Sequence, residues 1–449
     1  MKQFFSSCII FLSLLPSGFM AQTLNNQITR EPYLQAPSPS EITVRWRTNL
    51  MTRSTVFYGK DERNLNHRTD SLQYNTEHEV RLSGLEPDTR YYYRVVLPKD
   101  TLTGKIFSFY TLPQKRLSET YSFALFGDPG SPGEDQIKVR DAVMKYYADK
   151  KMDFWIQLGD NAYRHGTDQE FQNDFFTPFK EMLGHYPSFS TLGNHDYHDV
   201  DFGSKYAQTT KSNVYFKIFS LPARGEAGGV PSGNSSYYSM DVGHVHLISL
   251  DSYGIEKNGK MVFDPGSAQY EWLKQDLQAL ENHRGFIIVY THFPPFSKGT
   301  HDSDSDSIMI GMRENLLPLL ERYGVDLLIG GHSHAYERSP MMKGFYGKSA
   351  EFDTKYAFRE YRKNVEGFGK ADLYKKEGKE GIAYMVTGNS SATSASRYPD
   401  FPHRAMKYSN DRSSGAFIVE VQKNQLTMKW LTGNGIMEDA FVIEKDFRR

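Results

Sequence analysis

The chain contains the stretch Phe154-Trp-Ile-Gln-Leu-Gly-Asp-Asn-Ala-Tyr163, in which an apolar run ends in a glycine and a carboxylate. Further apolar runs of similar length lie at residues 121–126, 188–192, 245–250, 286–290 and 325–329. Between them are amphipathic segments of helical period, such as residues 139–146. Apolar strands that alternate with amphipathic helices predict a layered α/β domain.

Five short polar motifs stand at the ends of these apolar runs. They are Gly127-Asp-Pro-Gly130, Gly159-Asp-Asn-Ala-Tyr163, Gly193-Asn-His-Asp196, Val289-Tyr-Thr-His292 and Gly331-His-Ser-His334. Ligands of open α/β sheets bind at the carboxyl ends of the strands, so we expect the motifs to meet at one edge. Each motif alone is typical of a turn or a structural histidine. Carboxylates, imidazoles and a phenol gathered at one edge predict a metal site.

A different pattern precedes this domain, in residues 28–113. Short alternating strands are separated by turns, and the strand Glu41–Arg47 places Trp46 on its buried face. The segment Leu85–Val95 joins a turn to an aromatic strand, and it resembles the tyrosine corner of fibronectin type III sandwiches. No cluster of candidate catalytic residues lies here. We therefore expect an all-β, fibronectin type III-like domain with a structural or positioning role.

The α/β domain is assigned to residues 119–449, with a core at about 119–340. The segment 339–380 is polar and rich in Lys, Tyr and Gly, which predicts a long surface loop near the site. Residues 381–449 return to strand patterns and are expected to complete a sheet.

The first 21 residues have the features of a signal peptide. Lys2 precedes an apolar stretch that is too short to span a bilayer, and Ala21 offers a cleavage site. The only cysteine, Cys8, lies inside this segment. A cleaved protein would have neither disulfides nor thiolate ligands, so a metal would be held by His, Asp, Glu, Asn or Tyr. The sequence predicts a secreted or periplasmic protein without a membrane anchor after cleavage.

The charges of the chain are balanced. Lys and Arg total 53 against 54 for Asp and Glu, which gives a formal net charge of −1. This balance argues against binding to nucleic acid or to a membrane surface through a basic field. Attraction of an anionic substrate must therefore be local to its site.

The five motifs resemble those of the purple acid phosphatases, a branch of the calcineurin-like metallophosphoesterases, both in their order and in their residues. The likeness extends to the N-terminal sandwich, to Ser236–His246, to Gln269–Leu277 and from Ile382 to the end of the chain. It therefore covers nearly the whole mature chain. The resemblance implies an α/β metallophosphoesterase domain with two packed β-sheets flanked by helices, following the β sandwich.

The resemblance also implies a role for each residue of the motifs. The implied metal ligands are Asp128, Tyr163 and His334 at a first site, Asp160 as a bridge, and Asn194, His292 and His332 at a second site. His195 would be the catalytic residue that donates a proton or orients the phosphate. Asp196 follows it and could orient it.

Two further residues have alternative interpretations. His301, nine residues after His292, is a candidate for substrate binding, but its neighbours Asp302, Asp304 and Asp306 are also typical of a solvated acidic loop. Arg338 follows the last motif and could contact phosphate or close a turn.

One position separates this branch from other calcineurin-like phosphoesterases. Most members have a His two residues after the first Asp, where this chain has Gly130, and Tyr163 resembles the family's replacement ligand. Phenolate is a hard, anionic oxygen donor, which favours a trivalent ion such as Fe(III). The second site has mixed nitrogen and oxygen ligands and suits a divalent ion, either Fe, Zn or Mn.

The function implied is that of an acid phosphatase, which hydrolyses a small phosphate monoester with a metal-bound hydroxide as the nucleophile. Phosphodiesterase activity at the same metals is the alternative, because the motifs specify phosphoryl transfer and not the ester type. A non-catalytic cell-surface binding protein is a third reading, and the presence of all seven implied ligands argues against it. The sequence specifies neither the physiological substrate nor the oligomeric state.

Overall fold

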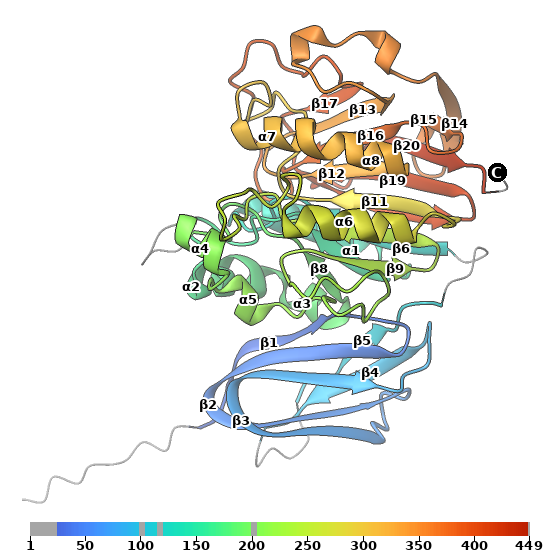
Figure 1. Ribbon diagram of the computed structural model, residues 1–449. Helices are drawn as coiled ribbons and strands as arrows, with labels where there is room; N and C mark the ends of the chain where they lie inside the picture. Colours follow the sequence, from blue (N-terminus) through green and yellow to red (C-terminus); the bar gives the residue numbers. More distant parts are fainter. Residues whose placement is uncertain (1–24, 98–103, 115–119, 199–203, 448–449) are drawn as a thin grey trace, which may run out of the picture.

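The computed structural model describes residues 25–97, 104–114, 120–198 and 204–447, and the predicted signal peptide lies outside this part of the chain. An N-terminal β domain is followed by a larger α/β domain that lies against one side of it (Figure 1). Within the described residues, no helix combines the length and apolarity needed to cross a bilayer.

The described part of the N-terminal domain contains five strands. They are β1 (Ile28–Gln35), β2 (Glu41–Gly59), β3 (His67–Ser83), β4 (Arg90–Val95) and β5 (Phe107–Tyr110). The first half of β2 pairs with β1 and the second half with β4, while β3 follows β2 on its other side with register shifts between Arg47 and Ser54. The strand predicted at 41–47 is thus the first half of one longer, bent strand, because a shift in register redirects a strand without ending it.

The core of this domain contains the predicted tyrosine corner. The backbone N–H of Glu86 donates to the hydroxyl of Tyr91 at 3.0 Å. Trp46 is buried and stacks on His78, with ring centroids 4.6 Å apart. Burial lowers the pKa of His78 to about 4, so this ring is neutral and packs as a core residue.

The α/β domain contains two mixed β-sheets. One has the order β14-β15-β20-β19-β18-β6-β7-β8 and continues into the N-terminal domain through a single parallel pairing, Ser188 of β8 with Gln35 of β1. Its strands are β6 (Thr120–Phe126), β7 (Phe154–Gln157), β8 (Ser188–Ser190), β14 (Glu360–Val365), β15 (Gly369–Lys376), β18 (Gly415–Gln422), β19 (Gln425–Thr432) and β20 (Met437–Lys445).

The second sheet has the order β17-β13-β16-β12-β11-β10-β9. Its strands are β9 (Tyr238–Val242), β10 (Val245–Ser249), β11 (Phe286–Tyr290), β12 (Leu327–Gly330), β13 (Tyr336–Met342), β16 (Ile382–Thr387) and β17 (Tyr408–Asn410). Strands β10, β11, β12 and β16 are parallel neighbours, so their carboxyl ends lie at one edge.

The two sheets pack face to face and are covered by helices outside (Figure 1). Strand β11 shows how the alternation of side chains builds both layers. Ile288 belongs to the core between the sheets, whereas Ile287 and Val289 belong to the core beneath α6 (Ala268–Ala279) and α8 (Leu317–Tyr323). On the other side, α1 (Glu134–Tyr146) and α3 (Thr177–His185) join the core of the larger sheet.

The segment 339–380 differs from the surface loop that the sequence predicts. After β13 and two short 3-10 turns, β14 and β15 form an antiparallel hairpin, and β15 pairs in parallel with β20 at the edge of the larger sheet. The composition is polar because β14 is an edge strand with mostly exposed or half-buried side chains. The hairpin therefore extends the sheet instead of lying free beside the site.

His246 joins β9, β10 and α6 through two carboxylates. Its Nδ1 lies 2.8 Å from Asp241 and its Nε2 lies 2.9 Å from Asp276, and the ring of His283 lies 6.2 Å away. Burial opposes a charge on the ring, but the hydrogen bonds to the two carboxylates raise the pKa of His246 to about 9. The imidazolium form therefore predominates at neutral pH.

This raised pKa predicts a loss of stability at alkaline pH. The contribution of His246 is complete below its unfolded pKa of 6.5 and disappears as pH rises through the folded pKa of about 9. We expect up to about 3 kcal/mol of the free energy of unfolding to be lost over this range. Urea unfolding at pH 6.5 and at about pH 9 would measure this loss of stability. A His246→Gln variant should lack this part of the pH dependence, and an equal slope in both proteins would contradict the assignment.

Candidate metal centre

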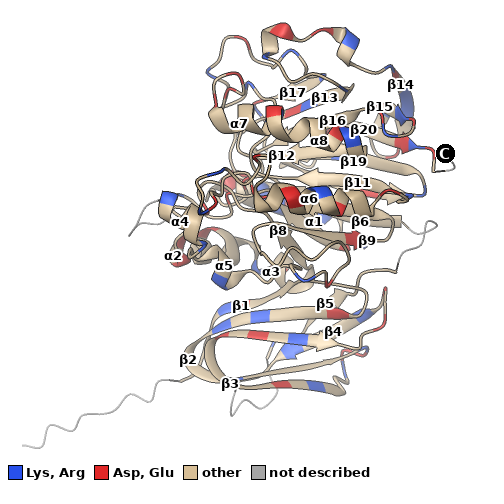
Figure 2. Ribbon diagram, in the orientation of Figure 1, with Lys and Arg blue, Asp and Glu red and all other residues tan. Residues whose placement is uncertain are grey.

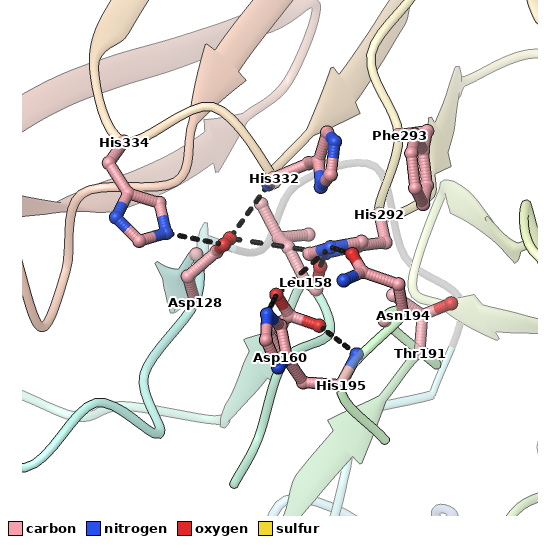
Figure 3. A network of polar contacts seen from close by, with 12 residues as sticks. Asp128, Leu158, Asp160, Thr191, Asn194, His195, His292, Phe293, His332 and His334 are labelled. Atoms are coloured by element: carbon pink, nitrogen blue, oxygen red, sulfur yellow. Dashed lines mark hydrogen bonds and ion pairs between the residues drawn. The ribbon is translucent and has the colours of Figure 1, made fainter. Parts of the chain in front are cut away.

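The five motifs converge at one edge of the two sheets. Asp128 follows β6, Asp160 follows β7, Asn194 follows β8, His292 follows β11 and His332 follows β12. Figure 3 shows that side chains from these loops point toward one another although they are far apart in the sequence. The structure thus brings together the residues that the sequence predicts as ligands.

The first group of donors is Asp128, Tyr163 and His334. The hydroxyl of Tyr163 lies 3.1 Å from Oδ2 of Asp128 and 3.3 Å from Nε2 of His334. Nε2 of His334 lies 3.3 Å from the same carboxylate oxygen. A phenol oxygen, a carboxylate oxygen and an imidazole nitrogen that face one space form a ligand set for a hard or borderline cation.

The second group of donors is Asn194, His292 and His332. Nδ1 of His292 donates to the carbonyl of Leu158 at 2.8 Å, which turns Nε2 toward the site, 3.1 Å from Oδ1 of Asn194. Single ligand atoms of Asp160, His292 and His332 all lie within 4.8 Å of one another. Nε2 of His332 is buried and has no hydrogen-bond partner among the described residues. A metal ion would satisfy this nitrogen.

Asp160 lies between the two groups. Its Oδ2 is 2.9 Å from the hydroxyl of Tyr163 and 3.3 Å from Nε2 of His292. Its Oδ1 accepts the backbone N–H of His195 at 2.9 Å, which fixes the carboxylate. One carboxylate oxygen therefore faces both donor sets.

The backbone around the carboxylates is unusual. Asp128, Asp160 and His332 have positive φ angles of 51°, 52° and 64°. Non-glycine residues rarely adopt this conformation, and it is concentrated at functional sites. A Cβ at Gly193 would lie 2.1 Å from Oδ1 of Asp160, and one at Gly331 would lie 2.3 Å from Oδ1 of Asp128. The glycines of the motifs therefore let the chain pass directly against the carboxylates.

The pKa values of the donor side chains bear on how the site would bind a cation. Burial raises the pKa of Tyr163 well above its usual value, and the carboxylates of Asp128 and Asp160 raise it further. Its phenol therefore loses its proton only beside a strong positive charge. Burial opposes a charge on His292, but Asp160 and Asp128 raise its pKa to about 9, so a bound cation would take the place of a proton on this ring. Burial and the nearby His301 lower the pKa of His332, which keeps its ring neutral.

His195 lies at the rim of the centre. Its Nδ1 donates to the carbonyl of Arg164 at 2.8 Å, and its Nε2 lies 4.0 Å from Oδ2 of Asp160. The ring of Tyr163 lies 4.4 Å from the ring of His195, measured between centroids. The carbonyl of Arg164 thus orients the imidazole, and side-chain motifs could not reveal this backbone contact.

Asp196 does not orient His195. Its carboxylate is buried and accepts the backbone N–H groups of Asn161 at 3.0 Å and Gly193 at 2.8 Å. Burial raises the pKa of Asp196 to about 7, and the charge of Asp160 adds to this effect. Asp196 therefore connects two of the ligand loops to each other.

His301 lies beside the second donor group, stacked on His332 with ring centroids 3.8 Å apart. The neighbouring carboxylates are not a freely solvated loop. Asp302 and Asp304 lie 2.8 Å and 3.0 Å from the buried ammonium group of Lys298. They therefore stabilise the segment that places His301 at the site.

Arg338 lies away from the centre. It is buried and forms ion pairs with Asp372 at 3.1 Å and with Asp439 at 2.9 Å. It therefore connects β13 to the edge of the larger sheet and does not reach the space between the donor groups.

Gly130 leaves no room for a histidine. A Cβ at this position would lie 2.2 Å from the carbonyl carbon of Asn161, and the backbone N–H of Gly130 donates to the carbonyl of Asp160 at 3.1 Å. The loops after β6 and β7 therefore pack too closely for any side chain here. Tyr163, in the loop after β7, supplies a donor to the first donor group instead.

Gly130→Ala is expected to destabilise the protein by about 1–3 kcal/mol, because the methyl group forces apart two ligand loops. Thermal unfolding of the metal-free protein would measure the change. Gly133→Ala is the matched control, since a Cβ at Gly133 would meet nothing within 4 Å. Equal stability of the two variants would show that the close approach is unimportant.

Comparison with protein families agrees with this geometry. Residues 121–336 match the family model of calcineurin-like phosphoesterases, and residues 30–124 match that of the N-terminal domain of purple acid phosphatases. Purple acid phosphatase 21 of Arabidopsis thaliana is 28% identical over 68% of this chain and 64% of its own length. Purple acid phosphatase 22 of the same plant is 30% identical over 61% of this chain and 55% of its own length. The chain thus aligns with under two thirds of the length of these two relatives.

Solved structures share the fold. A purple acid phosphatase from yellow lupin seeds superposes with a TM-score of 0.69 and 18% identity, covering 93% of this chain and 74% of that one. A structure of PhoD superposes with a TM-score of 0.64 and 14% identity, covering 94% of this chain and 91% of that one. The similarity therefore includes both the β domain and the α/β domain. The chain belongs to the purple acid phosphatase family of calcineurin-like metallophosphoesterases.

Proposed function

We propose that this protein is an acid phosphatase that hydrolyses phosphate monoesters at a dinuclear metal centre. The observation that carries the proposal is the position of Asp160. One oxygen of its carboxylate lies 2.9 Å from the hydroxyl of Tyr163 and 3.3 Å from Nε2 of His292, which belong to the two donor groups. A carboxylate shared in this way would hold two cations, one with each donor group.

The donor sets also favour different ions. Asp128, Tyr163 and His334 would hold Fe(III), because two anionic oxygens and one nitrogen suit a hard trivalent ion. Asn194, His292 and His332 would hold a divalent ion, either Fe, Zn or Mn. When bound, the two cations polarise the phosphate ester and activate a water molecule for in-line attack on phosphorus.

The side chains at the rim then act on the substrate. Because Nδ1 of His195 is held by the carbonyl of Arg164, a second proton is carried at Nε2 on the side of Asp160. From there it can pass to the leaving alkoxide. His301 would bind the phosphate from the opposite donor group, next to His332.

We also propose an extracytoplasmic location after removal of residues 1–21, with a small phosphorylated compound as the substrate. The sequence of this segment supports the location. The overall charge offers no basic field for nucleic acid.

Chelation tests the proposal. Removal of metal from the purified mature protein should abolish hydrolysis of 4-nitrophenyl phosphate, and iron with zinc should restore it. Elemental analysis should give two ions per chain. A bis(4-nitrophenyl) phosphate assay run in parallel distinguishes the phosphodiesterase alternative. Full activity of a metal-free sample would refute the two-metal function, and preferred turnover of the diester would replace the monoester assignment.

A further inference from the structure

Two arginines on adjacent strands of the N-terminal domain contact one carboxylate of the catalytic domain. Figure 2 marks basic positions on β1 and β2, at the side of the domain that lies next to α2 (Asp168–Glu170). Nη1 and Nη2 of Arg47 both contact the carboxylate of Asp168. Nη2 of Arg30 lies 3.0 Å from the same carboxylate, and its Nε donates to Gln172 at 2.9 Å. One aspartate thus receives two arginines from the other domain.

Two residues after Asp168, Glu170 holds the segment 163–167, which we call the tyrosine loop. Glu170, in the same helical turn, accepts the backbone N–H groups of Arg164 at 2.8 Å, His165 at 3.1 Å and Thr167 at 2.9 Å. These bonds hold the pKa of Glu170 at about 2, against the opposing effect of burial. The backbone of residues 164–167 is therefore folded around one carboxylate.

This loop fixes two residues of the proposed centre. Tyr163 immediately precedes Arg164, and the carbonyl of Arg164 accepts Nδ1 of His195 at 2.8 Å. A Cβ at Gly166 would lie 2.9 Å from the carbonyl oxygen of His195, so the loop also packs closely against the catalytic segment. A displacement of α2 would move both the phenol and the imidazole.

We infer that Arg47 and Arg30 are positioning residues, through which the N-terminal domain holds Tyr163 and His195 in place by way of Asp168 and Glu170. Arg30 is completely buried and lies over Phe176, with its guanidinium carbon 4.0 Å from the ring centroid. A buried arginine with a planar fork has little freedom, so it transmits the position of β1 accurately. The β domain, which has no catalytic cluster of its own, therefore acts on the reaction from outside the site.

Arg45 provides a matched control. It lies on the same strand as Arg47, is also buried, and also crosses to the catalytic domain, where it donates to the Ser220 hydroxyl at 3.0 Å and the Lys217 carbonyl at 2.6 Å. Its contacts lead to α5 (Tyr215–Ile218) and the following residues, not to the tyrosine loop. Arg45→Ala therefore removes an arginine of the domain interface without removing the connection to Glu170.

Hydrogen–deuterium exchange of the metal-free, full-length protein tests the connection without any catalysis. Arg47→Ala should increase exchange several-fold in the peptide 163–170, whose amides Glu170 holds, and Arg45→Ala should leave this peptide unchanged. Asp168→Asn is a second variant that weakens the same contact from the catalytic domain, in case Arg47→Ala does not fold. Unchanged exchange of this peptide in a folded Arg47→Ala or Asp168→Asn protein would overturn the inference.

The kinetic test rests on the proposed phosphatase function. In the metal-loaded enzyme, Arg47→Ala should lower kcat by about tenfold with little change in KM, as expected when a supporting residue of a metal site is lost. Arg47→Lys should restore only part of the loss, because an ammonium group cannot bind both oxygens of Asp168. A rise in KM alone would contradict positioning of His195. If the wild-type protein hydrolyses no phosphate ester, the proposed function fails, while the exchange experiment still decides the positioning role.

Discussion

Asp160→Asn is expected to remove nearly all phosphatase activity and to reduce the metal content of the purified protein. The substitution keeps the shape of the side chain but replaces the charged oxygen that faces Tyr163 and His292 with a neutral oxygen or an amide. Loss of residues that only support metal ligands costs about 10–100-fold in activity, so loss of a shared ligand should exceed 100-fold. Turnover of 4-nitrophenyl phosphate and elemental analysis of the same sample would measure both effects.

A control variant tests whether the effect requires the charge at this site or follows from the loss of any carboxylate. Asp141→Asn removes a carboxylate from the exposed face of α1, where its partner is Arg140, and should change neither activity nor metal content. The proposed bridging role fails if Asp160→Asn keeps two metal ions and normal turnover. Loss of one ion with retention of the other would show which donor group depends on the carboxylate.

The arrangement of the site could be predicted from the sequence because each donor follows a strand. Apolar runs fixed where the strands end, and the carboxyl ends of neighbouring parallel strands lie at one edge. The position of Asp160 directly after β7 is therefore a consequence of local sequence. The left-handed backbone of Asp160 and His332 is not visible in this pattern, because it arises from the close packing of the loops.

Other features depend on contacts between distant residues. The hairpin of β14 and β15 has a polar composition and becomes part of a sheet only because β20, far along the chain, pairs with β15. Lys298 gathers Asp302 and Asp304 together with Asp400, and no sequence spacing indicates the third partner. Backbone carbonyls that orient histidines, such as that of Leu158, carry no side-chain signature at all.

Tyr163→Phe is expected to abolish the visible colour of the iron-loaded protein. A phenolate bound to Fe(III) gives an intense charge-transfer band, and phenylalanine has no oxygen to form it. The ring itself should remain in place, because it packs against His195 with centroids 4.4 Å apart. The substitution therefore removes the donor atom while it keeps most of the packing.

The visible spectrum, iron content and turnover should be measured together at several pH values. Because burial and two carboxylates raise the pKa of Tyr163, metal uptake must release its proton. Iron loading of the wild-type protein should therefore weaken as pH falls, whereas the Tyr163→Phe variant should lose this proton release and about 10–100-fold in activity.

Tyr197→Phe is the matched control for the colour. The hydroxyl of Tyr197 is buried and donates to Asp251 at 2.6 Å, so this substitution removes a buried phenol outside the donor groups. The Tyr197→Phe variant should keep the band at the same wavelength, with the same absorbance for each iron bound. A band that persists in Tyr163→Phe would assign the colour to another ligand. A colourless wild-type enzyme, fully active with only zinc or manganese, would refute iron at this site. In that case the bridging role of Asp160 could still hold, because it depends on two cations and not on their identity.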